Sequence, residues 1–150
     1  LRLAGEFRLP TLDVVEAGRV IGYMGQQLIN PPSVEGWHQG SEWIDSGALV
    51  ERVNFAAGYL GDVQEPGVRD VIDRLASMNG GVFSPQQLVD GCLDLIGPLT
   101  VDEKTRQELI DRVADRGDVD LRDHVPGDES ELRVADVLKL IASCREFQLA

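Results

Sequence analysis

The chain has 150 residues, of which 43% are hydrophobic and 27% are charged, and this size and balance predict one globular domain. Its 26 acidic and 14 basic side chains give a formal net charge of −12. A domain this acidic should repel nucleic acid, so we expect no nucleic-acid partner. No apolar run reaches the length of a membrane span, and we expect no membrane insertion.

Apolar residues at helical spacing predict an all-α fold, a compact bundle of about six helices in one domain over residues 1–150. The first helix should follow a cap at Thr11 and end near Leu28–Asn30, because Pro31 and Pro32 disfavour helical backbone before them. Three glycines interrupt this helix, and they predict either a neighbour packed close to its backbone or a frayed helix: Gly18, Gly22 and Gly25.

A loop rich in proline, glycine and tryptophan follows this first helix, and we expect the loop to be ordered. Gly36 and Gly40 allow tight turns on either side of Trp37, and Trp43 supplies a second indole. Two interpretations stay open. The indoles could fix the loop onto the bundle, or they could form an exposed aromatic patch for a partner or a glycan.

Cap and stop residues divide the rest of the chain into further helices and give no convincing strand. The predicted starts are Asp45 or Ser46, Pro66, Ser84 with a capping box, Thr100 with Glu103, and Asp128. The predicted stops are Gly61, Asn79-Gly80-Gly81, Gly97-Pro98 and about Asp115. Residues Gly117–Gly127 are predicted to form a polar loop. The inward stripes of these helices should include Leu49, Met78 and Leu132.

Several polar residues are candidates for a binding site in or beside the central loop. These candidates are Trp37, His38, Glu42, Trp43 and Arg52. A metal site completed elsewhere could use His38, but a surface or loop-capping histidine is the simpler interpretation. Glu51 and Arg52 could be a functional carboxylate and its partner, but an ordinary ion pair between them is the simpler interpretation. No catalytic residue is assigned, and no cofactor is expected.

Four aspartates crowd the predicted polar loop and form a weak candidate for a calcium site: Asp115, Asp118, Asp120 and Asp123. Their spacing is not that of an EF-hand, and a solvated acidic loop is the alternative. Cys92 and Cys144 fall on or beside apolar helix faces, which is typical of buried thiols, while a disulfide between them stays open.

Two segments resemble a known family. Met24-Gly25-Gln26-Gln27-Leu28, Pro31-Pro32-Ser33-Val34-Glu35-Gly36-Trp37, Trp43-Ile44, Leu49 and Arg52 are similar to the C-terminal region of the bacterial domain-of-unknown-function 1800 family. The ending Ser143-Cys144-Arg145-Glu146-Phe147-Gln148 resembles the S-P-E-F-Q ending of that family, with Cys144-Arg145 at the place of its proline. The resemblance is strong at both ends of the chain and weak in the middle.

The resemblance implies a fold class and a setting but no chemistry. Family members are larger, mainly helical proteins without an established activity, and many are exported, so the resemblance implies a periplasmic or extracellular protein. The chain would then be the C-terminal part of a longer protein. We expect a non-catalytic structural or interaction module, whose partner is the N-terminal region of such a protein or another protein. Alternatives are an accessory or substrate-lining part of a hydrolase, and calcium-dependent adhesion through the loop Asp115–Asp123.

Overall fold

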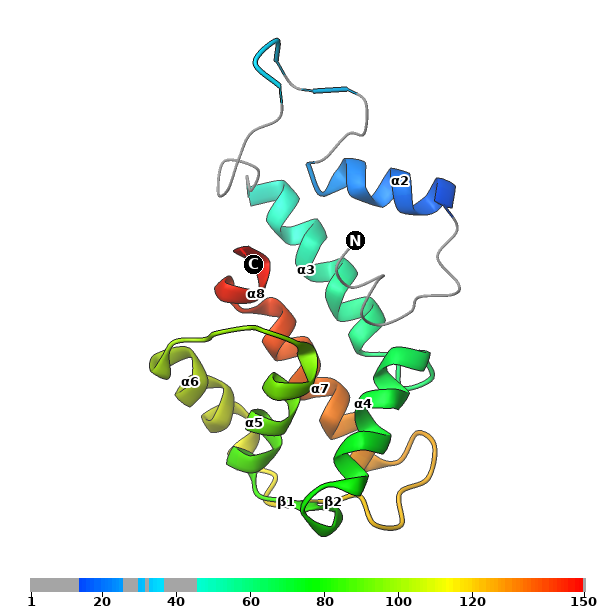
Figure 1. Ribbon diagram of the computed structural model, residues 1–150, viewed down its shortest axis with the longest axis vertical. Coiled ribbons are helices and arrows are strands. Elements are labelled where there is room, and N and C mark those ends of the chain that lie inside the picture. Colours follow the sequence, from blue (N-terminus) through cyan, green and yellow to red (C-terminus); the bar gives the residue numbers. More distant parts are fainter. Residues whose placement is uncertain (1–13, 26–29, 32, 37–45, 150) are drawn as a thin grey trace.

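The computed structural model describes residues 14–25, 30–31, 33–36 and 46–149. Within them the chain is mostly helical, which confirms the predicted all-α class (Figure 1). Seven α-helices and one short 3₁₀ helix are present in this part: α2 (Val14–Tyr23), α3 (Ser46–Leu60), α4 (Pro66–Ser77), η2 (Asn79–Gly81), α5 (Pro85–Ile96), α6 (Glu103–Ala114), α7 (Glu129–Ser143) and α8 (Arg145–Leu149).

Helix α7 is the centre of the fold. It packs against α3, α4, α5, α6 and α8, and its apolar face is completely buried at Val134, Leu138 and Ile141. One hydrophobic cluster joins these side chains to those of the surrounding helices. At Gly91 of α5 an added Cβ would lie 2.8 Å from a methyl group of Leu75, so glycine permits the close approach of α4 and α5.

Local signals placed most helix ends correctly. Ser84 forms the predicted capping box with Gln87, and Pro66 begins α4. Asp128 caps α7, as predicted. The predicted cap at Thr100 is wrong, because Asp102 caps α6 by accepting a hydrogen bond from the Thr105 amide at 2.7 Å.

The first described helix differs from its prediction. Helix α2 ends at Tyr23 rather than near residue 28, and Gly25 follows it with a φ of 91°, a left-handed conformation suited to glycine. No described neighbour lies within 4 Å of the position of a Cβ at Gly18, so packing against the described residues does not explain that glycine. The predicted cap at Thr11 lies outside the described residues.

A two-stranded antiparallel sheet occurs where the sequence predicted no strand. Strand β1 (Val82–Phe83) pairs with β2 (Val119–Asp120), and the Leu121 amide donates to the Gly81 carbonyl oxygen at 2.7 Å. Val119 and Leu121 are buried, so the segment predicted to be a polar loop contributes to the core. The pairing fixes the α6–α7 connection against the α4–α5 turn.

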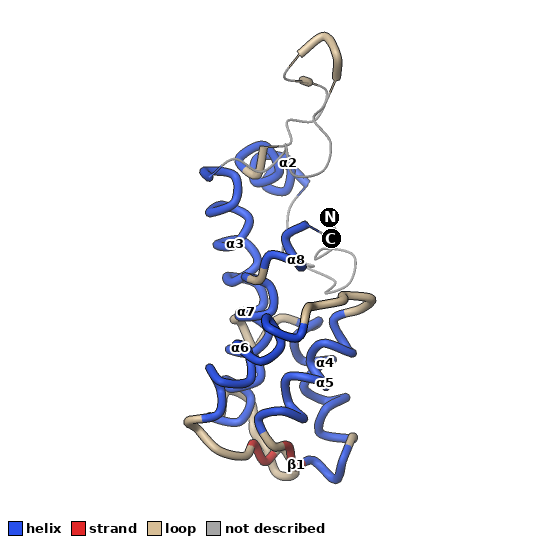
Figure 2. Tube along the Cα trace, turned by 90° about the vertical axis from the view of Figure 1, so that its left-hand side faces the viewer, coloured by secondary structure: helices blue, strands red, loops and turns tan. Residues whose placement is uncertain are grey.

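Helix α2 and the first turns of α3 stand apart from the body of the fold. Figures 1 and 2 show them at one end of the molecule, with β1 at the other. The members of the hydrophobic cluster in the described part of the chain lie between Ala56 and Phe147. We call α2 and residues 46–50 of α3 the arm. The predicted Pro/Gly/Trp-rich loop lies largely outside the described residues, but Ser33–Gly36 forms a tight turn with a φ of 101° at Gly36.

Candidate functional site

Arg52 joins helix α3 to the C-terminal helix α8. Its Nε donates to Oε1 of Gln148 at 3.2 Å, and its Nη2 donates to the Gln148 carbonyl oxygen at 2.9 Å. The Gln148 amide, 5% exposed, also donates to the Ala142 carbonyl oxygen in α7. Burial lowers the pKa of Arg52. The simple explanation by an ion pair with Glu51 does not describe these contacts. Instead, Arg52 holds α3 to α8. Arg52 and Gln148 belong to the two segments of the sequence that resemble the family.

The other four candidate binding residues, Trp37, His38, Glu42 and Trp43, lie outside the described residues. Both interpretations of the indoles therefore stay predictions. Of the predicted binding set, the structure places Arg52 alone, and its guanidinium contacts α8.

The aspartate loop is held by arginines. Arg122 donates from Nε and Nη2 to the Asp120 carboxylate, and these bonds lower the pKa of Asp120 to about 2. The Asp118 carbonyl oxygen accepts a hydrogen bond from Arg133 at 2.8 Å. Asp115 is the C-cap residue of α6. Among the described residues, no group of three or more His, Cys, Asp or Glu side chains could hold a metal ion. The calcium hypothesis thus gains no support from this arrangement.

A buried carboxylate that sequence reasoning missed lies in the first turn of α7. Glu131 is completely buried and accepts from Arg69 Nη1 at 2.9 Å, from the Gly127 amide at 2.7 Å and from His124 Nδ1 at 2.8 Å. Burial alone would raise the pKa of Glu131, but the hydrogen bonds from Gly127, His124 and Arg69 together lower it. The available signal was Glu131 three residues after the Asp128 cap, which is typical of an exposed capping box.

The two cysteines are free thiols in the structure, which answers the open question of a disulfide. Cys92 is completely buried, and burial raises its pKa to about 12. Burial also raises the pKa of Cys144. Both thiols are therefore protonated near neutral pH and poorly suited to nucleophilic chemistry.

The arm exposes large apolar side chains. Val15 is 78% exposed, Tyr23 59% and Val50 56%, and Leu49, predicted to face inward, is 38% exposed. On α2, Val15, Arg19 and Tyr23 follow one another at four-residue spacing and so share one face. The Arg19 guanidinium lies 5.6 Å from the centroid of the Tyr23 ring. No helix of the described chain is long and apolar enough to cross a membrane.

The fold and these contacts define a helical domain in which two distant sequence motifs meet at one arginine–glutamine contact. The chain belongs to the family described as protein of unknown function (DUF1800), whose family model matches residues 2–149. This match confirms the family suggested by the sequence motifs. Comparisons with curated proteins and with solved structures gave no significant match.

Proposed function

We propose that this domain is a non-catalytic interaction module, and that its arm docks on a second folded protein surface, in the same polypeptide or in another chain. The observation that carries the proposal is the division of the apolar side chains. Among the described residues the hydrophobic cluster begins at Ala56, whereas Val15, Tyr23 and Val50 of the arm are more than half exposed. Exposed apolar side chains gathered on one element are typical of protein interfaces.

The chemistry of α2 fits this role. Tyrosine and arginine are enriched among the residues that contribute most to protein–protein binding, because each combines a large contact area with directional hydrogen bonds. Arg19 and Tyr23 lie on the same face as Val15 and contact each other. The Arg52–Gln148 contact supports the proposal further, since it fixes α3 to the body and so gives the arm a defined direction.

The test uses a photo-reactive phenylalanine analogue at Tyr23 in the intact protein, within the cells that produce it. We expect illumination to give one discrete covalent adduct, and we expect the added substitution Val15→Asp to reduce its yield. Val125, 59% exposed in the α6–α7 connection, is the matched control position and should give no such adduct. Equal labelling from both positions, or no adduct from Tyr23, would overturn the proposal.

The two alternatives rest on other residues. A hydrolase role depends on Trp37, His38, Glu42 and Trp43, and calcium-dependent adhesion depends on the loop Asp115–Asp123. No contact among the described residues favours either role.

A further inference from the structure

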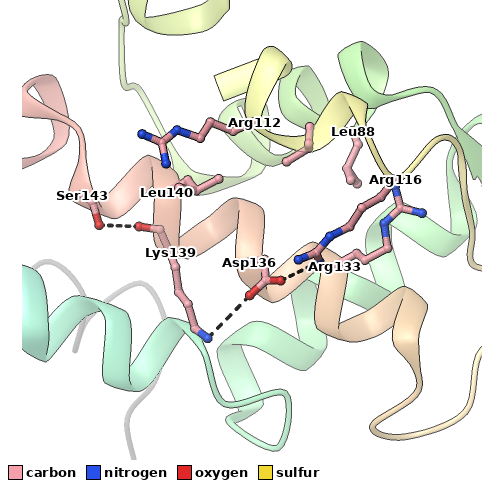
Figure 3. A pocket seen from close by; sticks show the side chains of 9 residues that line it. Leu88, Arg112, Arg116, Arg133, Asp136, Lys139, Leu140 and Ser143 are labelled. Carbon is pink, nitrogen blue, oxygen red and sulfur yellow. Dashed lines mark hydrogen bonds and ion pairs between the residues drawn. The ribbon is translucent and has the colours of Figure 1, made fainter. Parts of the chain in front are cut away.

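A cavity of about 340 Å³ lies between α6 and α7, next to Leu88 of α5 (Figure 3). Its volume is at the lower end of the range for sites that bind small molecules. This cavity is remote in sequence from the arm, and the inference drawn from it does not depend on the proposed docking function.

The cavity concentrates positive charge. Its walls include four cationic side chains, Arg112, Arg116, Arg133 and Lys139, and a single carboxylate, Asp136. The chain as a whole has 26 acidic and 14 basic side chains, so the cavity reverses the charge balance of the protein. A cluster of like charges in a partly enclosed space is costly unless counter-charges accompany it.

Two of the cations share the Asp136 carboxylate. Arg116 Nη1 contacts Asp136 Oδ2 at 3.0 Å, and Lys139 Nζ contacts Oδ1 at 3.7 Å. Figure 3 shows the two cations meeting Asp136 from different sides, with Arg112 across the cavity beside Leu140. The side chain of Arg112, which is exposed, forms no ion pair or hydrogen bond with the side chain of another described residue.

Arg133 is the cation with the least access to solvent. It is 9% exposed, and its guanidinium donates to the carbonyl oxygens of Asp118 and Gly117 rather than to a carboxylate. Burial, followed by the nearby charge of Arg116, lowers the pKa of Arg133. The charges of Glu129 and Asp118 oppose this lowering, but neither residue lines the cavity, where Asp136 is the one carboxylate.

We propose that this cavity binds an organic oxyanion, a phosphate, sulfate or carboxylate group attached to a small apolar body. Guanidinium groups match the planar or tetrahedral oxygens of these anions with paired hydrogen bonds. Leu88, Val113 and Leu140 line the same cavity and provide the apolar contact. Asp136 competes with the ligand, because its carboxylate contacts Arg116 and Lys139.

The test is isothermal titration calorimetry of the whole chain at low ionic strength with three probes: phenyl phosphate, phenyl sulfate and benzoate. Benzyl alcohol is the neutral control, and inorganic phosphate tests the need for the apolar body. We expect saturable binding of at least one charged probe and none of the alcohol. Binding should weaken in 0.5 M NaCl, because at that salt concentration the interaction between exposed charges is screened over about 4 Å.

Two substitutions in the cavity should change the affinity for the charged probes in opposite directions. Arg112→Gln should weaken binding by about tenfold, a typical loss for a charged hydrogen bond, whereas Asp136→Asn should tighten it by removing the competing anion. Arg74→Gln, an exposed arginine of α4 outside this cavity, should leave binding unchanged. The proposal is overturned if no charged probe binds, if Arg112→Gln and Arg74→Gln have equal effects, or if Asp136→Asn weakens binding.

Discussion

At the scale of single residues, Glu131 combines two properties that rarely occur together. Its carboxylate is completely buried, yet burial does not neutralise it, because three donors surround it. An ionised carboxylate only accepts hydrogen bonds, so Nδ1 of His124 must be the donor in their contact. The charge of Glu131 therefore links α4, the α6–α7 connection and the start of α7 through Arg69, His124 and Gly127.

We expect Glu131→Gln to lower the free energy of unfolding by about 3 kcal/mol, because the Arg69 guanidinium loses its buried anion and keeps only the exposed Asp73 carboxylate at 4.0 Å. The new amide NH₂ group would also face the donors that now contact the carboxylate. Urea unfolding followed by circular dichroism would measure this. Glu108→Gln is the matched control, since Glu108 is 66% exposed and pairs with Lys104 on the surface. Its effect should stay below about 0.5 kcal/mol. Similar losses in both variants would contradict the role given to Glu131.

The pH dependence of the same variant has a definite sign. The pKa of Glu131 is lowered in the folded protein. Its contribution to stability is therefore complete above the pKa of an unfolded glutamate, about 4.3, and is lost as pH falls through the lowered folded pKa. The difference in unfolding free energy between wild type and Glu131→Gln should be largest at neutral pH and shrink below pH ~4. A difference that grew on acidification would be inconsistent with an ionised Glu131.

At the scale of elements, the helix ends show which local signals decide structure. Ser84 has both parts of its capping box, with the Gln87 amide 3.3 Å from Ser84 Oγ. Thr100 offered a similar pattern with Glu103, but Asp102 caps α6 instead. An ionised acceptor at the positive end of a helix is a stronger cap than a hydroxyl, which explains the shift of two residues.

The caps can be ranked by melting temperature. Ser84→Ala should destabilise the protein by about 1 kcal/mol, the usual value for a lost cap. Asp102→Ala should also lower the melting temperature, whereas Thr100→Ala should leave it unchanged, because Thr100 does not cap α6. Differential scanning calorimetry of the three variants would show this order. If Thr100→Ala lowered the melting temperature more than Asp102→Ala, Thr100 would be the cap of α6, as the sequence predicted.

The contact between α3 and α8 depends on two donor nitrogens of the Arg52 guanidinium group. Arg52→Lys keeps the charge, but one ammonium group cannot reproduce the two bonds to Gln148, so we expect a loss of about 1.5 kcal/mol. Arg74→Lys, in an exposed pair with Asp70, should cost less than about 0.5 kcal/mol. In a double-mutant cycle with Gln148→Leu, we expect a coupling near 1 kcal/mol. Additive effects would show that Arg52 and Gln148 act independently.

The sequence predicted those elements whose causes are local. Proline, glycine and cap residues placed α4, α5 and α7 correctly, and the apolar period identified most of the core. Leu132 and Met78 were expected to face inward but are 47% and 38% exposed, since each lies near an end of its helix, where partners cover less of the surface. Strand β2 was missed because two residues are too few to show the alternation of apolar and polar residues that indicates a strand.

The described part of the candidate site was not predictable for a different reason. Arg52 and Gln148 are 96 residues apart in the chain, and no local pattern indicates which distant groups meet. The family motifs marked both segments, but only the fold shows that they contact each other. Likewise, the residues of the cavity come from three helices and from Arg116 in the α6–α7 connection, and no local sequence pattern indicates that they meet.

At the scale of the whole molecule, the described fold divides into a body with a core and an arm outside that core, in which Ala48 is the buried apolar residue, at 5% exposed. Among the described residues, the hydrophobic cluster lies in the body, from Ala56 to Phe147. Among the helices, α2 packs chiefly against α3 (Figure 2). That the chain is a single domain of a longer protein stays a prediction, since nothing in this arrangement tests it.

This division predicts unequal local stability, which native-state hydrogen exchange can measure. Amides of α2 should exchange through local opening, with free energies of about 0–2 kcal/mol, because none of the α2 side chains that the structure describes is buried. Amides in the middle of α5 and α7, around Cys92 and Leu138, should exchange only through global unfolding. Low denaturant concentrations should leave α2 exchange unchanged and accelerate exchange in α7. If the amides of α2 were as protected as those of α7, the arm would be part of the cooperative core, and its exposed apolar face would need another explanation than docking.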